Sequence, residues 1–123
     1  MAKILKKSQL TQDIHPKGWG YEVWIENRPE YCGKLLKFNA GKRCSMHFHL
    51  NKTETMYLQS GRIDIDCIDP ETAQKYTVAL HPGDSLLIPR GQMHQIHALR
   101  ESELFEFSTV HEDSDSYRME KGD

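Results

Sequence analysis

The sequence lacks any long hydrophobic run and has no strong surplus of charge of either sign. Its 123 residues are 37% hydrophobic and 28% charged, with a formal net charge of −2. A membrane-spanning helix needs about 20 predominantly apolar residues in a row, and binding to nucleic acid or anionic lipid is usually accompanied by a basic surplus. We therefore expect neither a membrane nor a nucleic acid as partner. A chain of this length buries roughly two-thirds of its surface on folding, enough for one domain.

Cysteine is also scarce. Cys32, Cys44 and Cys67 are odd in number, lie far apart and form no Cys-x-x-Cys pair. A disulfide framework usually needs an even set of cysteines, so we expect reduced thiols in a reducing compartment. The basic first seven residues are not followed by the apolar stretch of a signal peptide. The expected location is the cytoplasm.

Long helical periodicity is missing as well, and short alternating segments that end at turn residues take its place, a pattern typical of strands. The expected strands are Tyr21–Glu26, Lys34–Phe38, Cys44–His49, Glu54–Gln59, Arg62–Ile68, Lys75–Leu80, Ser85–Ile88, Gln95–Ala98 and Leu104–Val110. In the clearest of them, Ile63, Ile65 and Cys67 alternate with polar residues, as in a strand with one buried face. The sequence predicts a single all-β domain over residues 1–123, a sandwich or small barrel. Its barrel core is expected at about 16–111, followed by a polar tail at 112–123 that is irregular or forms a partly ordered cap.

Four residues have the chemistry and spacing of a metal site. His47 and His49 are two apart in an expected strand, so their imidazoles share one face and lie about 6–7 Å apart along it. Glu54 follows after a short turn and can supply a carboxylate oxygen, while His94 would come from a different strand. Three imidazoles and one carboxylate suit one divalent transition metal (Mn, Fe, Co, Ni, Cu or Zn) better than Ca or Mg. An isolated His-x-His pair is more often an ordinary surface or core feature than a pair of metal ligands. The surrounding sequence pattern therefore decides whether a metal site is expected.

That wider pattern is Gly41-x5-His47-x-His49-x4-Glu54-x6-Gly61, followed by Gly83-x5-Pro89-x-Gly91-x2-His94. The two blocks resemble the two signature motifs of the cupin superfamily. The resemblance implies a double-stranded β-helix, also called a jelly-roll barrel, with the metal held inside by the three histidines and the glutamate. The glycines permit tight turns at strand ends. One position departs from the family pattern: Ala98 stands where many members have an asparagine.

A second resemblance concerns the segment Pro16-Lys17-Gly18-Trp19-Gly20-Tyr21-Glu22 and the stretches Cys32–Phe38, Ser45–His49, Glu106–Ser108 and Asp113–Arg118. They are similar to the cupin domain of type II mannose-6-phosphate isomerases over about residues 16–118. The nucleotidyltransferase domain often fused to those enzymes is absent from this sequence. The resemblance implies an isomerase or epimerase that acts on a sugar or sugar phosphate. The metal would then coordinate the carbonyl and hydroxyl oxygens of the substrate and stabilise an enediolate.

Such a reaction needs a base and groups that bind the substrate. Glu106 is the candidate catalytic base, with a surface carboxylate as the equally plausible alternative. Lys34, Arg90 and Gln92 are the candidate substrate-binding residues. Lys34 would bind a phosphate or hydroxyl group if it points inward, although a lysine near a strand start is usually solvated. Arg90 would bind an anionic group at the barrel mouth, unless it is an ordinary exposed turn residue. Of the four remaining histidines, His97 is expected to face outward in a structural role, and those at positions 15, 81 and 111 are expected at the surface.

Other functions fit the same four ligands. A Fe(II)-dependent dioxygenase would use the open metal positions for substrate and oxygen. A non-catalytic module that senses a sugar or metabolite would bind without chemistry, and lyases and decarboxylases also remain. Trp19, Tyr21 and Trp24 form an aromatic group that could stack on a sugar, but we favour packing in the core or in a dimer. Small cupins commonly pair through their N-terminal strands, so the resemblance implies a homodimer.

Overall fold

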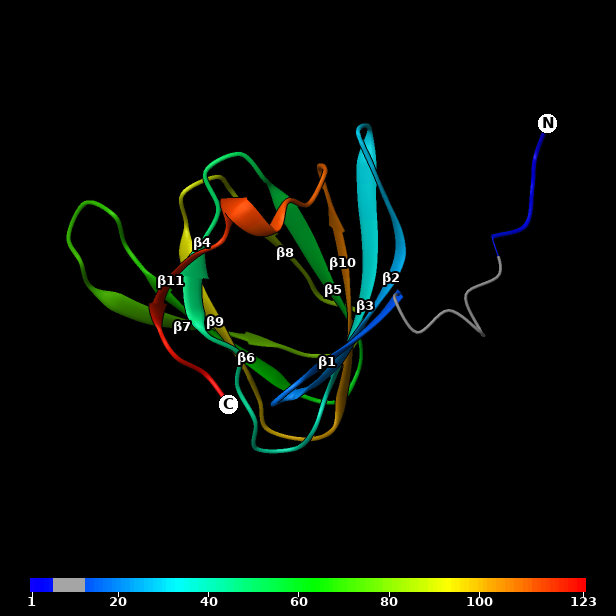
Figure 1. The fold of residues 1–123 in the computed structure, drawn as a ribbon. Helices are drawn as coiled ribbons and strands as arrows, with labels where there is room; N and C mark the ends of the chain where they lie inside the picture. The colour runs from blue at the N-terminus through cyan, green and yellow to red at the C-terminus, as the bar shows by residue number, and fades with distance from the viewer. Residues whose placement is uncertain (6–12) are drawn as a thin grey trace.

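The chain folds into two antiparallel β-sheets that face each other, as a computed structural model shows for residues 1–5 and 13–123 (Figure 1). Its elements, in chain order, are β1 (Ile14–Lys17), β2 (Gly20–Arg28), β3 (Tyr31–Phe38), β4 (Met46–Phe48), β5 (Glu54–Ser60), β6 (Ile63–Ile68), β7 (Lys75–Leu80), β8 (Ser85–Ile88), β9 (Met93–Ala98), β10 (Ser102–Ser108), the short 3-10 helix η2 (Asp113–Asp115) and β11 (Tyr117–Glu120). The expectation of an all-β fold is confirmed. No helix in this described part of the chain is long and apolar enough to cross a membrane.

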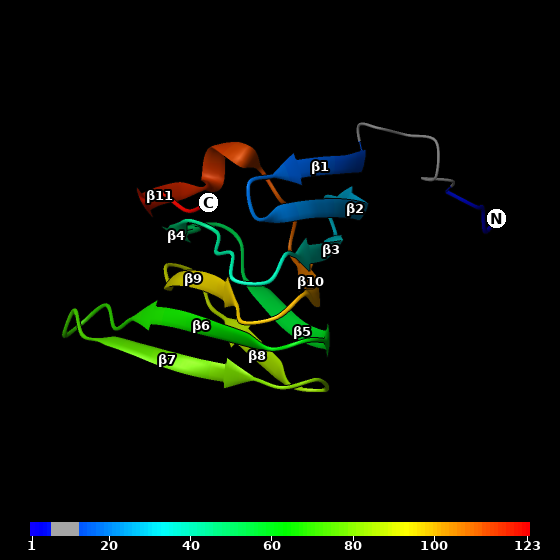
Figure 2. The same cartoon turned by 90° about the horizontal axis from the view of Figure 1, so that it is seen from below.

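One sheet contains six strands in the order β1-β2-β3-β10-β5-β8, and the other contains five in the order β11-β4-β9-β6-β7. Each sheet combines early and late strands of the chain, as a jelly-roll does. The N-terminal hairpin β1–β2 and the C-terminal strand β11 lie at one side of the barrel, opposite β7 and β8 (Figure 2). A side chain at Gly18, in the β1–β2 turn, would collide with the backbone of Asp123. The N-terminal hairpin and the C-terminal segment therefore touch each other.

The inward-facing residues change from apolar to ionisable along the strands of the six-stranded sheet. At one end the fully buried residues are Phe38, Leu58 and Leu104, and toward the other end the buried residues are Lys34, Glu54 and Glu106. The pairing of β3 with β10 sets Glu106 directly opposite Lys34. Buried charges are rare in protein cores unless they are paired or functional. The apolar end supplies the core, and the ionisable end positions the candidate site.

The strands expected from the sequence correspond to β2 through β10, with shifted ends. β4 is shorter than expected, so His49 follows the strand, and β9 begins early enough to include His94. β1 and β11 were not expected, because β1 contains Pro16 and β11 is exposed at all four positions. Neither shows the alternation that identifies a strand. The expected polar tail thus contains η2 and β11, and β11 pairs with β4.

The turn glycines and the cysteines behave as the sequence indicates. Gly41 and Gly61 adopt φ values of 80° and 95°, a region that favours glycine because it has no Cβ. Cys32, Cys44 and Cys67 are all free and buried. Burial raises the pKa of the Cys44 thiol to about 12. The side chain of Cys44 therefore packs as a small apolar group, while its Sγ accepts a hydrogen bond from the backbone N–H of Ile96.

Candidate metal centre and cavity

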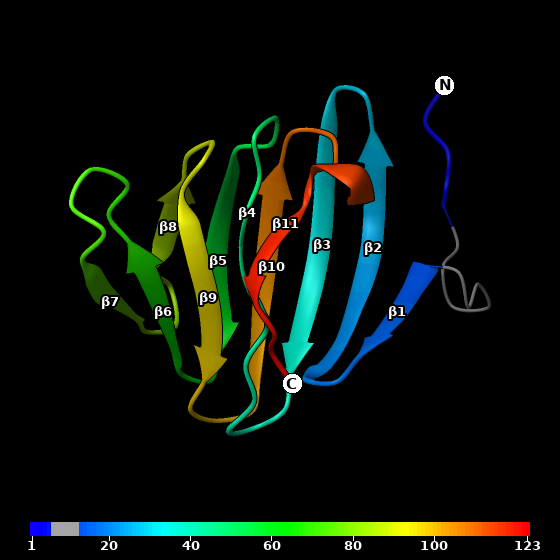
Figure 3. The same ribbon diagram turned by 60° about the vertical axis from the view of Figure 1, so that its left-hand side comes forward.

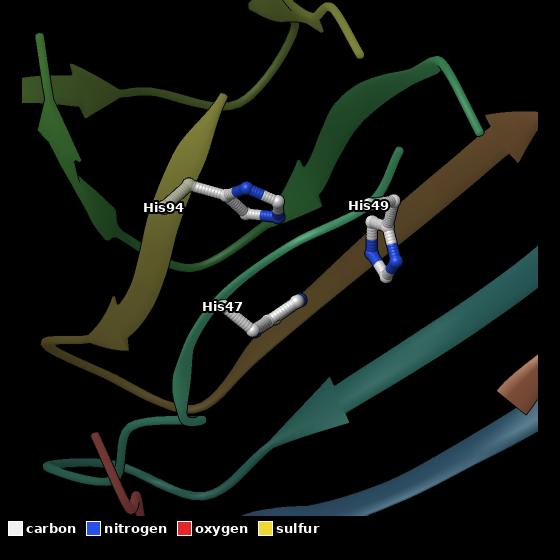
Figure 4. Close-up of side chains that lie close together, drawn as sticks. All are labelled: His47, His49 and His94. Carbon is white, nitrogen blue, oxygen red and sulfur yellow. The ribbon is translucent and has the colours of Figure 1, made fainter. Parts of the chain in front are cut away.

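Three histidines from two neighbouring strands converge inside the barrel. His47 lies on β4, directly opposite His94 on β9, and His49 follows immediately after β4. One ring nitrogen from each histidine lies within 4.8 Å of the corresponding nitrogens of the other two. Figure 4 shows the three imidazoles around one space between these strands. A cluster of this size can hold a single metal ion, because the nitrogens are close enough to bind one centre.

Hydrogen bonds fix which ring nitrogen each histidine offers. In each case Nδ1 lies near a backbone carbonyl oxygen: Ser45 at 2.9 Å for His47, Asp115 at 3.0 Å for His49, and Gln92 at 2.9 Å for His94. A carbonyl can only accept a hydrogen bond, so Nδ1 carries the proton and donates it. In a neutral imidazole the lone pair is then on Nε2. Metal-binding histidines in proteins are commonly oriented in this way.

The protonation of the first two histidines favours metal binding. Burial, together with the neighbouring His94, lowers the pKa of His47 to about 3. Burial and the nearby ammonium group of Lys52 also lower the pKa of His49. Both rings are therefore neutral near pH 7 and available as ligands. Burial alone would lower the pKa of His94, but the carboxylate of Glu54, together with the backbone carbonyl of Gln92 and the charge of Glu106, raises it above its ordinary value.

Glu54 lies beside the three-histidine cluster. Its Oε1 is 3.1 Å from Nε2 of His94 and 4.0 Å from Nε2 of His49. Burial alone would raise the pKa of Glu54, but His94 and Lys52 together lower it below its ordinary value. Neither carboxylate oxygen of Glu54, nor Nε2 of His94, makes a hydrogen bond of good geometry within the described chain. Buried polar atoms without such partners are costly, and a divalent cation would satisfy all three. The donor set therefore fits a transition metal, with Glu54 as the expected fourth ligand.

A cavity of ≈ 680 Å³ opens next to the histidines. Its lining includes His47 and His49 together with Glu106, the candidate base, and Lys34, one of the three candidate substrate-binding residues. Glu106 is 6% exposed and Lys34 is 3% exposed. The alternative of a surface carboxylate at Glu106 is therefore wrong, as is that of a solvated Lys34. Both side chains point inward, where they can meet a bound molecule.

Lys52 joins the metal cluster to the candidate base. Its Nζ lies 3.2 Å from Oε2 of Glu106, 3.4 Å from Oε2 of Glu54 and 3.0 Å from Nδ1 of His111. The contacts with Glu106 and His111 are hydrogen bonds, and the contact with Glu54 is an ion pair. Burial and the negative charge of Glu54 raise the pKa of Glu106 to about 7, even though Lys52 acts in the opposite direction. Glu106 can therefore exist in both protonation states near neutral pH.

Three of these residues were missed or misplaced by sequence reasoning. Lys52 has the same parity as Glu54, which could have indicated a shared face, but no strand was expected there. His111 was expected at the surface, but it lines the cavity. Burial and the two lysines lower its pKa to about 4, so the neutral ring accepts from Lys52 while its Nε2–H donates to Asp113. Asp115 lies in the polar tail and no role at the site was expected for it, yet it is only 4% exposed.

The other part of the cavity is formed by the N-terminal strands. Lys34 is 3.4 Å from a carboxylate oxygen of Glu22, and its Nζ lies 4.4 Å from the ring centroid of Trp24. Trp19 packs in the core, stacked on Phe38 with 4.0 Å between ring centroids. Both Trp19 and Trp24 line the cavity, but Trp24 does not belong to the core cluster, and Tyr21 is exposed. Of the aromatic group in the sequence, Trp19 thus packs in the core as we favoured, and Trp24 contributes to the wall of the cavity.

Arg90 and Gln92 lie elsewhere. Arg90 is exposed, and its Nε donates to the backbone carbonyl of Asn51. The side-chain amide of Gln92 donates to the backbone carbonyls of Ile68 and Met93. Neither residue is among those that the structure places along the cavity. The structure gives both of them local roles in holding turns and strand ends.

Comparison with known proteins agrees with this fold. Residues 35–120 match the cupin family. The chain belongs to the cupin family. No curated protein matches this cupin. The resemblance to type II mannose-6-phosphate isomerases stays a prediction.

Solved structures similar to this cupin include oxalate decarboxylase from Bacillus subtilis. A variant of that enzyme has a TM-score of 0.76 and 16% identity, covering 86% of this chain and 30% of the other. The enzyme at pH 4.6 has a TM-score of 0.71 and 20% identity, with coverage of 86% and 29%. A structure from work on the Mn(II) centres of the same enzyme has a TM-score of 0.72 and 19% identity, with coverage of 86% and 30%. At these identities the likeness concerns the fold alone, and this cupin spans about 30% of the length of those proteins.

Proposed function

We propose that this cupin is a metal-dependent isomerase or epimerase of a sugar or sugar phosphate. His47, His49, Glu54 and His94 would hold one divalent transition metal, such as Mn, Fe, Zn, Ni or Co. One observation carries the proposal: a buried carboxylate, Glu106, lines the same cavity as His47 and His49 without belonging to the histidine cluster. A base beside a metal centre is what proton transfer next to a carbonyl group requires.

The bound metal would hold oxygen atoms of the substrate and stabilise the negative charge that develops on them. Glu106 would take the proton from one carbon and return it to the neighbouring carbon. Lys52 holds this carboxylate at 3.2 Å and so fixes its position. Lys34, which is buried in the same cavity, would bind a hydroxyl or an anionic group of the substrate. Both lysines are buried, and charge interactions are stronger in such surroundings than in water.

The test loads the protein separately with each of the five metals and incubates it with a panel of aldoses, ketoses and their phosphates. NMR follows ketose formation, epimerisation and the exchange of carbon-bound hydrogen with solvent. We expect turnover of at least one sugar or sugar phosphate. Glu106→Gln should then lower kcat by about 10²- to 10⁴-fold, the usual contribution of a general base. Glu103→Gln is the matched control on the same strand, where the carboxylate accepts from Ser60.

Two further arms of the panel cover other reactions. Oxalate is included because the structural neighbours are oxalate decarboxylases, and release of carbon dioxide from it would replace the isomerase proposal. Oxygen uptake that depends on Fe(II) would replace it with a dioxygenase. Saturable binding of a sugar without turnover, at confirmed metal occupancy, would indicate a sensing module. Full activity of the Glu106→Gln variant would remove this residue from the mechanism.

A further inference from the structure

The C-terminal segment reaches into the barrel beside the metal ligands. η2 and the loop between β4 and β5 lie at the same end of the molecule (Figure 3). Asp115, the last residue of η2, is 4% exposed. The strand that follows, β11, pairs with β4 and sets Arg118 opposite His47. A segment late in the sequence is therefore attached to the strand that carries the first metal ligand.

The backbone of Asp115 contacts a metal ligand directly. Its carbonyl oxygen accepts the hydrogen bond from Nδ1 of His49, at 3.0 Å, across 66 residues of sequence. The corresponding carbonyls for His47 and His94 come from Ser45 and Gln92, each only two residues earlier in the sequence. His49 thus depends on a distant segment for its tautomer and ring orientation.

The carboxylate of Asp115 binds the chain that follows His49. Its two oxygens accept hydrogen bonds from three consecutive backbone N–H groups, those of Leu50, Asn51 and Lys52, at 3.0–3.1 Å. These residues connect His49 to Glu54. Charge-assisted hydrogen bonds to a buried carboxylate are stronger than neutral ones. One side chain therefore fixes the backbone between two expected metal ligands, and with it the start of the Lys52 side chain.

We propose that Asp115 is a positioning residue of the metal centre: its carbonyl orients His49, and its carboxylate holds the loop that carries Lys52 and leads to Glu54. Outer partners of metal ligands typically change metal affinity by about 10- to 100-fold when they are altered. The inference rests on the metal site of the proposed function but not on the reaction, so absence of isomerase activity leaves it intact.

The test compares the wild-type protein with Asp115→Asn and Asp115→Ala. Asparagine keeps the shape and one acceptor oxygen, whereas alanine removes every side-chain acceptor. The matched control is Asp69→Asn, because Asp69 also accepts backbone N–H groups, those of Glu71 and Thr72, in the turn between β6 and β7. That turn projects away from the barrel (Figure 1). Circular dichroism and thermal melting confirm that each variant is folded at the temperature of measurement.

Two readouts follow in the folded variants: the dissociation constant of the metal, by competition with a chelator, and the visible spectrum of the Co(II) form. We expect Asp115→Asn to weaken metal binding by about tenfold, Asp115→Ala by up to about 100-fold, and both to shift the Co(II) bands. Asp69→Asn should leave affinity and spectrum unchanged. A merely structural role would lower the melting temperature alone. If Asp115→Asn keeps the wild-type affinity and spectrum, or if the wild-type protein binds no metal, the proposal is overturned.

Discussion

Lys52→Met tests whether the buried charges form one unit. The ammonium group of Lys52 lies 3.2 Å from Glu106 and 3.4 Å from Glu54, and all three side chains are at most 7% exposed. Methionine preserves much of the apolar stem but removes the ammonium group, so that Glu54 and Glu106 stay buried without this positive charge. Breaking a buried ion pair by removing one partner costs about 3–5 kcal/mol. We expect a loss near the lower end, because Glu106 can protonate to relieve part of the penalty.

The assay is urea unfolding of the metal-free protein at several pH values, with the exposed Lys75→Met on β7 as control. The pKa of Glu106 is raised from 4.5 to about 7, so its contribution favours the folded state at low pH and is lost as pH rises through that range. Without Lys52 the pKa rises further. The difference between variant and wild type should therefore grow from pH 5 to pH 8. The reasoning would be refuted if Lys52→Met lost no more free energy of unfolding than Lys75→Met, or if its loss became smaller as the pH rises.

Two other predictions concern the core. Cys32, Cys44 and Cys67 should not react with a thiol reagent at pH 8 until the protein unfolds, because all three are buried and the pKa of Cys44 is about 12; rapid labelling of the native protein would contradict this. Trp19→Ala should cost about 3–5 kcal/mol in the free energy of unfolding, since the ring stacks on Phe38 in the core. Trp24→Ala should cost less, because Trp24 is only partly buried and lies outside the core cluster, and equal losses from the two variants would contradict this.

Much of the fold was predictable because its information is local. Ile63, Ile65 and Cys67 show period-2 burial, and all three are at most 2% exposed. The motif spacing placed His47, His49 and His94 together correctly, since strand parity and tight glycine turns determine their direction. β11 could not be found in the same way, because it is an exposed strand whose pairing with β4 leaves no alternation in the sequence.

The residues around the ligands were harder to predict. Lys34 and Glu106 have the parity of core residues, but a charged side chain in a strand usually faces water. Their burial depends on contacts with Glu22, Trp24 and Lys52, which tertiary structure alone brings together. The role of Asp115 depends on a contact across more than 60 residues. No local sequence pattern indicates such a contact.

The metal content of the purified protein tests the central claim most directly. Wild-type protein and two variants, His47→Ala and His81→Ala, are loaded with Mn, Fe, Co, Ni or Zn, desalted and measured by mass spectrometry of the elements. His81 is the control, because it is exposed and its nearby charged partner is Asp84. We predict one divalent metal ion per chain in the wild type and in His81→Ala, and a loss of most of it in His47→Ala. A full complement of metal in folded His47→Ala would contradict the assignment of the site.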